Sequence, residues 1–173
     1  MRKPEDIFGH MTWNIDGMAF GSDAAGGEFV SLSDGTIGFN SSEGEIGRIA
    51  ENMKELFGLL INCPCFKDFL VDDIYKDDIS LKKCAEAIEA QYRDDFNSIG
   101  IYDWDSVKEE ISKELGFSVD YSIYDTTLKK FYNAGTREPQ YKRTFKENDV
   151  IKKSNCIISR PMEEWIKNML SEY

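Results

Sequence analysis

Apolar and polar residues alternate in short runs along the first forty residues of the chain, and turn sequences separate the runs. Asp16-Gly17 and Asp34-Gly35 are pairs that favour tight two-residue turns, because glycine adopts positive φ without strain. The glycine-ended stretch 23–27 suits a looser connection. The pattern predicts an antiparallel meander with strands over 10–15, 18–22, 28–33 and 36–40.

A helical period replaces this alternation after residue 42. Ser42 precedes Glu45 by three positions, the spacing of a capping box. The apolar residues that follow recur on one helical face: Ile46, Ile49, Ala50, Met53, Leu56, Phe57 and Leu60. We therefore expect a helix over 45–60 that packs across the meander.

The remainder of the chain is predicted to be mainly helical. Residues that favour helix starts precede four further apolar patterns: Ser80, Asp105, Asp125 and Pro161. Gly116 and Gly135 would end the second and third of these helices. Residues 141–146 and 155–158 are expected to be extended. Residues 117–124 alternate well enough for a strand, but the period alone does not decide between strand and helix.

Three of these helices have a predicted inward face. The helix that starts at Ser80 would bury Leu81, Cys84, Ala85, Ile88, Tyr92 and Phe96. The helix after Asp105 would bury Val107, Ile111 and Leu115, and the last helix Met162, Trp165, Ile166 and Met169. The whole is a single α+β domain of 173 residues, sheet-rich over 8–40 and mainly helical over 42–173, with helices covering an antiparallel or mixed sheet.

Composition agrees with a packed domain and offers little for catalysis. Hydrophobic residues make up 41% and aromatic residues 13%, which excludes a disordered chain. The only histidine, His10, has no serine or cysteine spaced for a catalytic dyad, and the glycines of 21–27 lack the Lys-Ser/Thr of a phosphate-binding loop. We expect no enzyme and no catalytic residues.

The four cysteines, Cys63, Cys65, Cys84 and Cys156, do not form paired C-x-x-C units, and His10 is their only possible histidine partner. Reduced thiols in a cytoplasmic protein are therefore expected, with no zinc and no cofactor. The start of the chain turns acidic at once, unlike a signal peptide, and no apolar run has the length of a membrane span. No membrane partner is expected.

The net charge and its distribution along the chain limit the classes of partner that we expect. The net charge is −11, distributed as −6 over residues 1–70, −7 over 71–135 and +2 over 136–173. Phosphate backbones would be repelled by the first two thirds of the chain, so no nucleic acid is expected. A basic protein would be attracted and steered toward the chain. Acidity that serves only solubility remains the alternative.

Two groups of aspartates are the predicted partner-binding residues: Asp72, Asp73, Asp77, Asp78, Asp94, Asp95, Asp103 and Asp105. The first four could instead form a solvated loop before a helix, or hold Mg²⁺ or Ca²⁺. The last four, with Glu109 and Glu110, are interleaved with Tyr92, Phe96, Tyr102 and Trp104. Aromatic residues beside carboxylates suit an interface for Arg or Lys, although core aromatics with solvated neighbours would give the same pattern.

One stretch of sequence resembles a known family. Residues 18–39, MAFGSDAAGGEFVSLSDGTIGF, followed by IAENMKEL over 49–56, are similar to the SUKH superfamily. Phe20, Asp23, Gly26 and Gly27 match the family's glycine-rich loop. Asp34-Gly35 matches its hairpin, and Ile49, Ala50 and Leu56 match the helix that follows, whereas Asn52 and Met53 stand where serine and phenylalanine are common.

The resemblance covers roughly residues 15–60 and contains no catalytic signature. It implies a mixed sheet with helices on its faces. It also implies an immunity protein that binds and blocks a toxin, often a nuclease, or a regulatory interaction protein. The expectation is thus a protein-binding module that blocks a basic toxin. The alternatives are a regulatory or scaffold protein without a toxin partner, and an Asp-rich metal-dependent enzyme.

Overall fold

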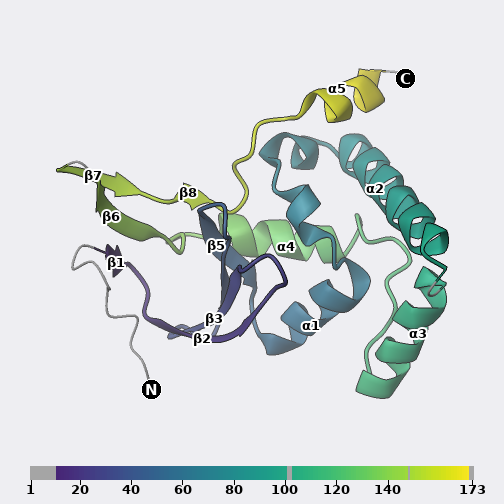
Figure 1. Cartoon of the computed structure of the whole chain (residues 1–173), viewed down its shortest axis with the longest axis horizontal. Helices are drawn as coiled ribbons and strands as arrows, with labels where there is room; N and C mark the ends of the chain where they lie inside the picture. The colour runs from purple at the N-terminus through teal and green to yellow at the C-terminus, as the bar shows by residue number, and fades with distance from the viewer. Residues whose placement is uncertain (1–10, 101–102, 148, 172–173) are drawn as a thin grey trace. The chain divides into compact units, whose positions relative to one another are not determined.

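The computed structural model describes residues 11–100, 103–147 and 149–171 (Figure 1). The chain divides into two compact units. Unit 1 comprises Met1–Leu56 and Phe131–Ser159, and unit 2 comprises Phe57–Lys130 and Arg160–Tyr173. All the strands of the described residues belong to unit 1, and most of the helical residues belong to unit 2. The α+β fold class is therefore confirmed.

Unit 1 is built around a five-stranded mixed sheet with the order β2-β3-β4-β5-β8. Its strands are β2 (Gly17–Ser22), β3 (Glu28–Leu32), β4 (Ile37–Asn40), β5 (Glu45–Ala50) and β8 (Asn155–Cys156). Neighbours from β2 to β5 are antiparallel, and β8 runs parallel to β5. The turn at Asp34-Gly35 is confirmed: Gly35 has φ of 87°, and Gly35 N donates to the carbonyl of Leu32 at 3.0 Å.

The predicted turn at Asp16-Gly17 is wrong. β1 (Met11–Trp13) pairs with β6 (Arg143–Glu147), which in turn pairs with β7 (Val150–Lys153) in a separate three-stranded antiparallel sheet. The Asn14 side chain fixes this path, since it donates to the carbonyl of Gln140 and accepts from the amide of Lys142, both at 2.7 Å. Gly17 serves close packing instead, because a Cβ there would lie 2.6 Å from Val30 Cγ1.

The predicted helix over 45–60 is also wrong in its first half. Residues 45–50 form β5, and α1 (Met53–Asn62) begins only after them. All six residues of β5 are buried, so the strand lacks the alternation of a one-sided strand, and Ile46, Ile49 and Ala50 mimic a helical period. Asn52, not Ser42, caps the helix, because its Oδ1 accepts from the amide of Glu55 at 3.0 Å.

Ile49 and Leu56 are nevertheless core residues, exposed by only 1% and 2%. Replacing either with alanine is expected to lower the free energy of unfolding by about 2–5 kcal/mol, through lost burial and a residual cavity. Urea denaturation measures this cost. The control is Met53→Ala in the first turn of α1, where the side chain is 39% exposed. An equal cost at all three positions would contradict the assignment of Ile49 and Leu56 to the core.

Helices form most of unit 2. They are the 3-10 helices η1 (Phe66–Phe69) and η2 (Asp72–Lys76), and the α-helices α2 (Asp78–Ser98), α3 (Trp104–Leu115) and α5 (Glu164–Ser171), while α4 (Thr127–Thr136) begins in unit 2. The predicted inward residues of α2 are confirmed as buried at Leu81, Cys84, Ala85 and Ile88, and Tyr92 and Phe96 are half-buried. Asp77, rather than Ser80, caps α2.

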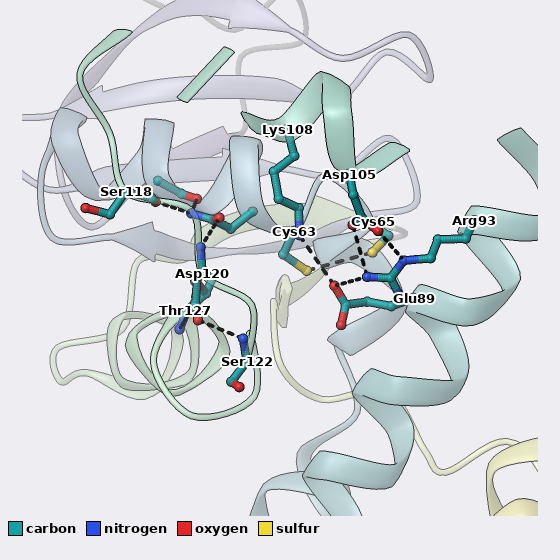
Figure 2. Close-up of polar contacts among 12 residues, drawn as sticks. Cys63, Cys65, Glu89, Arg93, Asp105, Lys108, Ser118, Asp120, Ser122 and Thr127 are labelled. Atoms are coloured by element: carbon teal, nitrogen blue, oxygen red, sulfur yellow. Dashed lines mark hydrogen bonds and ion pairs between the residues drawn. The ribbon is translucent and has the colours of Figure 1, made fainter. Parts of the chain in front are cut away.

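Residues 117–124 contain no strand or helix in the structure. This segment is an irregular loop that side chains of Asn62 and Asp120 hold in place (Figure 2). Asn62 Oδ1 accepts from the amide of Asp120 at 2.7 Å, and the Asp120 carboxylate accepts from the amide and hydroxyl of Thr127 at 3.1 and 2.6 Å. Buried side-chain oxygens therefore replace a neighbouring strand as the partners of this backbone.

Two helices of unit 2 do not bury the predicted faces. In α3, Ile111 and Leu115 are 40% and 55% exposed, whereas Lys108 and Ser112 are buried. In α5, Ile166 is buried as predicted but Trp165 is 43% exposed; the side chain of Met169 lies outside the description. In both helices, the residues that are buried and the residues that are exposed therefore differ from those that polarity predicts.

Candidate functional site

The first group of predicted partner-binding aspartates mostly stabilises local structure. Asp73 in η2 forms an ion pair with Lys76, and Asp72 in the same turn is half-buried. Asp77 caps α2, and its carboxylate accepts from the amide and hydroxyl of Ser80, both at 2.8 Å. These hydrogen bonds hold the pKa of Asp77 below its ordinary value. A carboxylate used in this way is a poor choice for partner binding.

Asp78 completes the first group and pairs with Lys129, with 2.9 Å between Oδ1 and Nζ. The second group is similar at Asp103 and Asp105. Asp103 caps α3 by accepting from the amide of Asp105 and the hydroxyl of Ser106. Asp105 in turn accepts from Nε and Nη2 of Arg93, both at 3.2 Å.

Asp94 and Asp95 differ from the other six. Both are exposed near the end of α2, and neither side chain has a hydrogen-bond or ion-pair partner among the described residues. Of the eight predicted positions, these two are the carboxylates that remain available to a partner.

Two ion pairs connect side chains of α2 to side chains of α3 (Figure 2). Glu89 lies 3.5 Å from Lys108 Nζ, and Arg93 forms the two hydrogen bonds to Asp105. The two contacts join the second half of α2 to the first half of α3. The bidentate contact of a planar guanidinium fixes orientation as well as distance. The surface formed by the two helices is therefore preorganised.

The inner side of α3 is unusually polar. Trp104, Lys108 and Ser112 follow at intervals of four residues, and the side chain of Lys108 is only 4% exposed. Trp104 Nε1 and Ser112 Oγ are buried without a hydrogen-bond partner among the described residues. Burial raises the pKa of Glu89, and the nearby cations Lys108 and Arg93 oppose that rise. Packing this stripe inward rotates α3 and leaves its apolar residues at the surface.

The outer side of α3 is the feature that sequence reasoning missed. Ile111 and Leu115 are exposed there, and Glu110 and Glu114 stand on the neighbouring positions of the helix without an ion-pair partner among the described residues. These four residues are called the acidic α3 face below. The spacing of Val107, Ile111 and Leu115 predicts an apolar stripe that faces the core. The only sequence signal against this prediction is that a charged residue, Lys108, directly follows Val107.

Cys63 and Cys65 form a buried thiol pair in unit 2, with their sulfur atoms 3.8 Å apart (Figure 2). Burial, together with the contact to Cys65, raises the pKa of the Cys63 thiol well above its ordinary value. A neutral thiol is a poor nucleophile and a poor metal ligand, since both roles require the thiolate. All four cysteines are free in the structure, and Cys84 is buried while Cys156 is half-buried.

Unit 1 contains an open polar cavity of about 480 Å³ beside the Asp34-Gly35 turn. Arg48 lines it but is 2% exposed, and its guanidinium is occupied by Thr36 at 2.9 Å, Asp34 at 2.7 Å and the carbonyl of Pro139. Arg137, at the same cavity, pairs with Glu51. The charged groups of this cavity thus tie together three segments of unit 1.

The remaining predictions concern metals and His10. Within the described ranges, no three His, Cys, Asp or Glu side chains gather closely enough to hold a metal ion. His10 and Tyr102 lie outside the described residues. In the same part of the chain, no helix is both long enough and apolar enough to cross a bilayer.

Comparison of the chain with models of protein families, with curated proteins and with solved structures finds no match.

Proposed function

We propose that this chain is a protein-binding module that docks a basic partner protein on the acidic α3 face, with Asp94 and Asp95 contributing from α2. One observation carries the proposal. Helix α3 buries Lys108 and Ser112 and leaves Ile111 and Leu115 at the surface beside carboxylates that have no partner among the described residues.

Exposed apolar side chains give a partner surface to desolvate, which is where most binding energy arises. Carboxylates around them accept charge-assisted hydrogen bonds from Arg or Lys and repel acidic competitors. The face is therefore suited to a basic, partly apolar surface. The net charge of −11 adds long-range attraction for such a partner.

The biological role we propose is that of an immunity-type inhibitor that covers the basic surface of a toxin, in keeping with the resemblance of residues 15–60 to the SUKH superfamily. A nuclease toxin needs a basic cleft for its own phosphate-rich substrate, and an acidic inhibitor would occupy that cleft. A regulatory protein of the same family would share the docking chemistry but lack a toxin encoded beside it.

The test uses the product of the gene adjacent to this one, expressed as an inactive variant. The variant chain carries Glu110→Gln, Glu114→Gln, Asp94→Asn and Asp95→Asn, which keep side-chain size and remove four charges. The association rate at low salt should fall by about tenfold, because electrostatic steering accounts for one to three orders of magnitude. Stopped-flow or surface-binding kinetics over a salt series would measure it.

A control that removes two charges replaces exposed carboxylates of unit 1, Glu28→Gln and Glu138→Gln, and should change the rate less than twofold. Ile111→Ser should mainly raise the dissociation rate, since short-range apolar contacts act after encounter. Substitution at Asp77, Asp103 or Asp105 is avoided, because these residues cap or bridge helices. If neither the four-carboxylate variant nor Ile111→Ser changed the binding kinetics, the interface would lie elsewhere.

A further inference from the structure

The three-stranded sheet of unit 1 carries the opposite charge from the rest of the chain. Between residues 142 and 153 stand five basic residues, Lys142, Arg143, Lys146, Lys152 and Lys153, against two acidic ones, Glu147 and Asp149. In Figure 1 β6 and β7 form the hairpin that carries them. A basic hairpin on a protein of net charge −11 creates a charge dipole within one molecule.

One face of this hairpin combines lysines with an exposed apolar residue. Lys146 pairs with Ile151, and Thr144 pairs with Lys153, so all four side chains point to the same side of the sheet. Ile151 is 74% exposed, and Lys153 is exposed without an ion-pair partner among the described residues. Lys146 forms an ion pair with Asp149, a side chain that is itself 93% exposed. Lys146, Ile151 and Lys153 are called the basic β7 face below.

The aromatic residues of the same sheet are already stacked within the molecule. Trp13 lies against Tyr141, with ring centroids 5.3 Å apart and an interplanar angle of 17°. The Arg143 guanidinium lies over the rings of both Trp13 and Phe145, at 5.8 and 5.3 Å. The Trp13 ring therefore already contacts Tyr141 and Arg143, which leaves it a poor platform for nucleic-acid bases. The exposed isoleucine also has no counterpart on a phosphate backbone, so the chemistry favours an acidic protein surface.

We propose that the basic β7 face binds the acidic α3 face of a second copy of this chain. The two faces are chemical complements: lysines around Ile151 on one, and glutamates beside Ile111 and Leu115 on the other. The inference rests on the proposed role of the acidic α3 face as a docking surface. Because the two faces differ, each copy offers one of each, and the contact is head-to-tail.

A head-to-tail contact predicts an observable behaviour. Mass should grow with protein concentration beyond a dimer, through rings or open chains. The association is expected at about 0.15 M salt, where a Debye length of about 8 Å screens the repulsion between two copies of net charge −11 but not the contacts between the faces, and it should weaken as salt is raised toward about 1 M. A basic partner that occupies the acidic α3 face would release the copies from one another.

The experiment is sedimentation equilibrium on the full-length protein and on two reversed-charge variants, Lys146→Glu with Lys153→Glu and Glu110→Lys with Glu114→Lys. Each variant alone should stay at the mass of one copy, 19.9 kDa. An equal mixture of the two variants should associate again, because the mixture contains one native pair of faces and one reversed pair. The control, Lys54→Glu with Lys130→Glu, has the same charge change as Lys146→Glu with Lys153→Glu and should associate like the parent.

A parent protein that sediments as one copy at about 0.15 M salt up to its solubility limit would overturn the proposal. So would association that the reversed-charge variants retain. Either result leaves the proposed function standing, provided that the four-carboxylate variant still loses its basic partner. Conversely, self-association that the reversed-charge variants abolish, together with a basic partner that binds the four-carboxylate variant as fast as the parent, would leave the acidic α3 face as a docking surface for a second copy and remove its proposed role with a basic partner.

Discussion

Replacing Arg48 with methionine is expected to lower the free energy of unfolding by about 3 kcal/mol, the lower end of the cost of breaking a buried ion pair, because the Asp34 side chain is 32% exposed. Arg48 is 2% exposed and donates to Thr36, Asp34 and the carbonyl of Pro139. Methionine fills a similar volume but donates nothing, so Oδ2 of Asp34 and the carbonyl of Pro139 each lose a donor, while Thr36 still donates to Oδ1 of Asp34. Each group that loses its donor accounts for about 1–3 kcal/mol of the expected loss. Urea denaturation monitored by tryptophan fluorescence would measure the change.

The pH dependence of the unfolding free energy distinguishes the contribution of charge from that of packing at the Arg48–Asp34 pair. Partial burial raises the pKa of Asp34, but hydrogen bonds from Thr36 and Arg48 outweigh it and lower the pKa to about 2. Because the folded pKa lies below the unfolded value of about 3.9, the stabilisation from Asp34 is present above that value and is lost as the pH falls toward 2. The stability difference between the parent and Asp34→Asn should therefore shrink over this window.

Arg137→Met provides the matched control, because the ion pair of Arg137 with Glu51 has both side chains more than a third exposed. Exposed pairs contribute about 0–1 kcal/mol, so this variant should lose little. Equal losses at Arg48 and Arg137 would show that Arg48 is not the group that ties these segments of unit 1 together.

Arg48 also shows why part of the fold was predictable and part was not. The strands from residue 17 to 40 follow from the alternation of apolar and polar residues in the sequence and from Asp34-Gly35, because a glycine turn leaves a local signal. β5 leaves none, since both of its faces are buried and an arginine stands in its middle. The partners that make that arginine acceptable, Asp34 and Pro139, lie far from it in sequence.

The candidate site also has one part that the sequence predicts and one part that it does not. Acidity and aromatic interleaving in residues 71–135 pointed to the α2–α3 region, and local rules account for Asp77 and Asp103 as helix caps. The orientation of α3 could not be predicted, because it depends on the pairing of Lys108 with Glu89, 19 positions earlier in the chain. Without that pairing, Ile111 and Leu115 fit the pattern of an inward face.

Lys108→Met tests this orientation directly, and a loss of about 3–5 kcal/mol in unfolding free energy is expected near pH 7. The Lys108 Nζ lies 3.5 Å from Glu89 Oε1, and the side chains are 4% and 13% exposed. Without Lys108, Glu89 keeps only the contact to Arg93 at 3.9 Å, and Arg93 also binds Asp105. A buried carboxylate that lacks sufficient positive charge must stay ionised at a cost or take up a proton.

The pH dependence of Lys108→Met distinguishes lost charge from lost packing. Burial already raises the pKa of Glu89, and removal of the neighbouring cation should raise it further. A carboxyl whose folded pKa is above its unfolded value destabilises the fold where it is ionised, and this penalty fades as the pH falls through the folded pKa. The loss in Lys108→Met should therefore shrink as the pH falls from 7 through the folded pKa of Glu89, and Glu89→Gln in the same chain should recover most of it at pH 7. The exposed pair Lys82–Glu86 gives the control, Lys82→Met, with a cost under about 1 kcal/mol. A loss that stays constant with pH and that Glu89→Gln does not relieve would mean that α3 is held by packing alone, and the exposure of Ile111 would then need another cause.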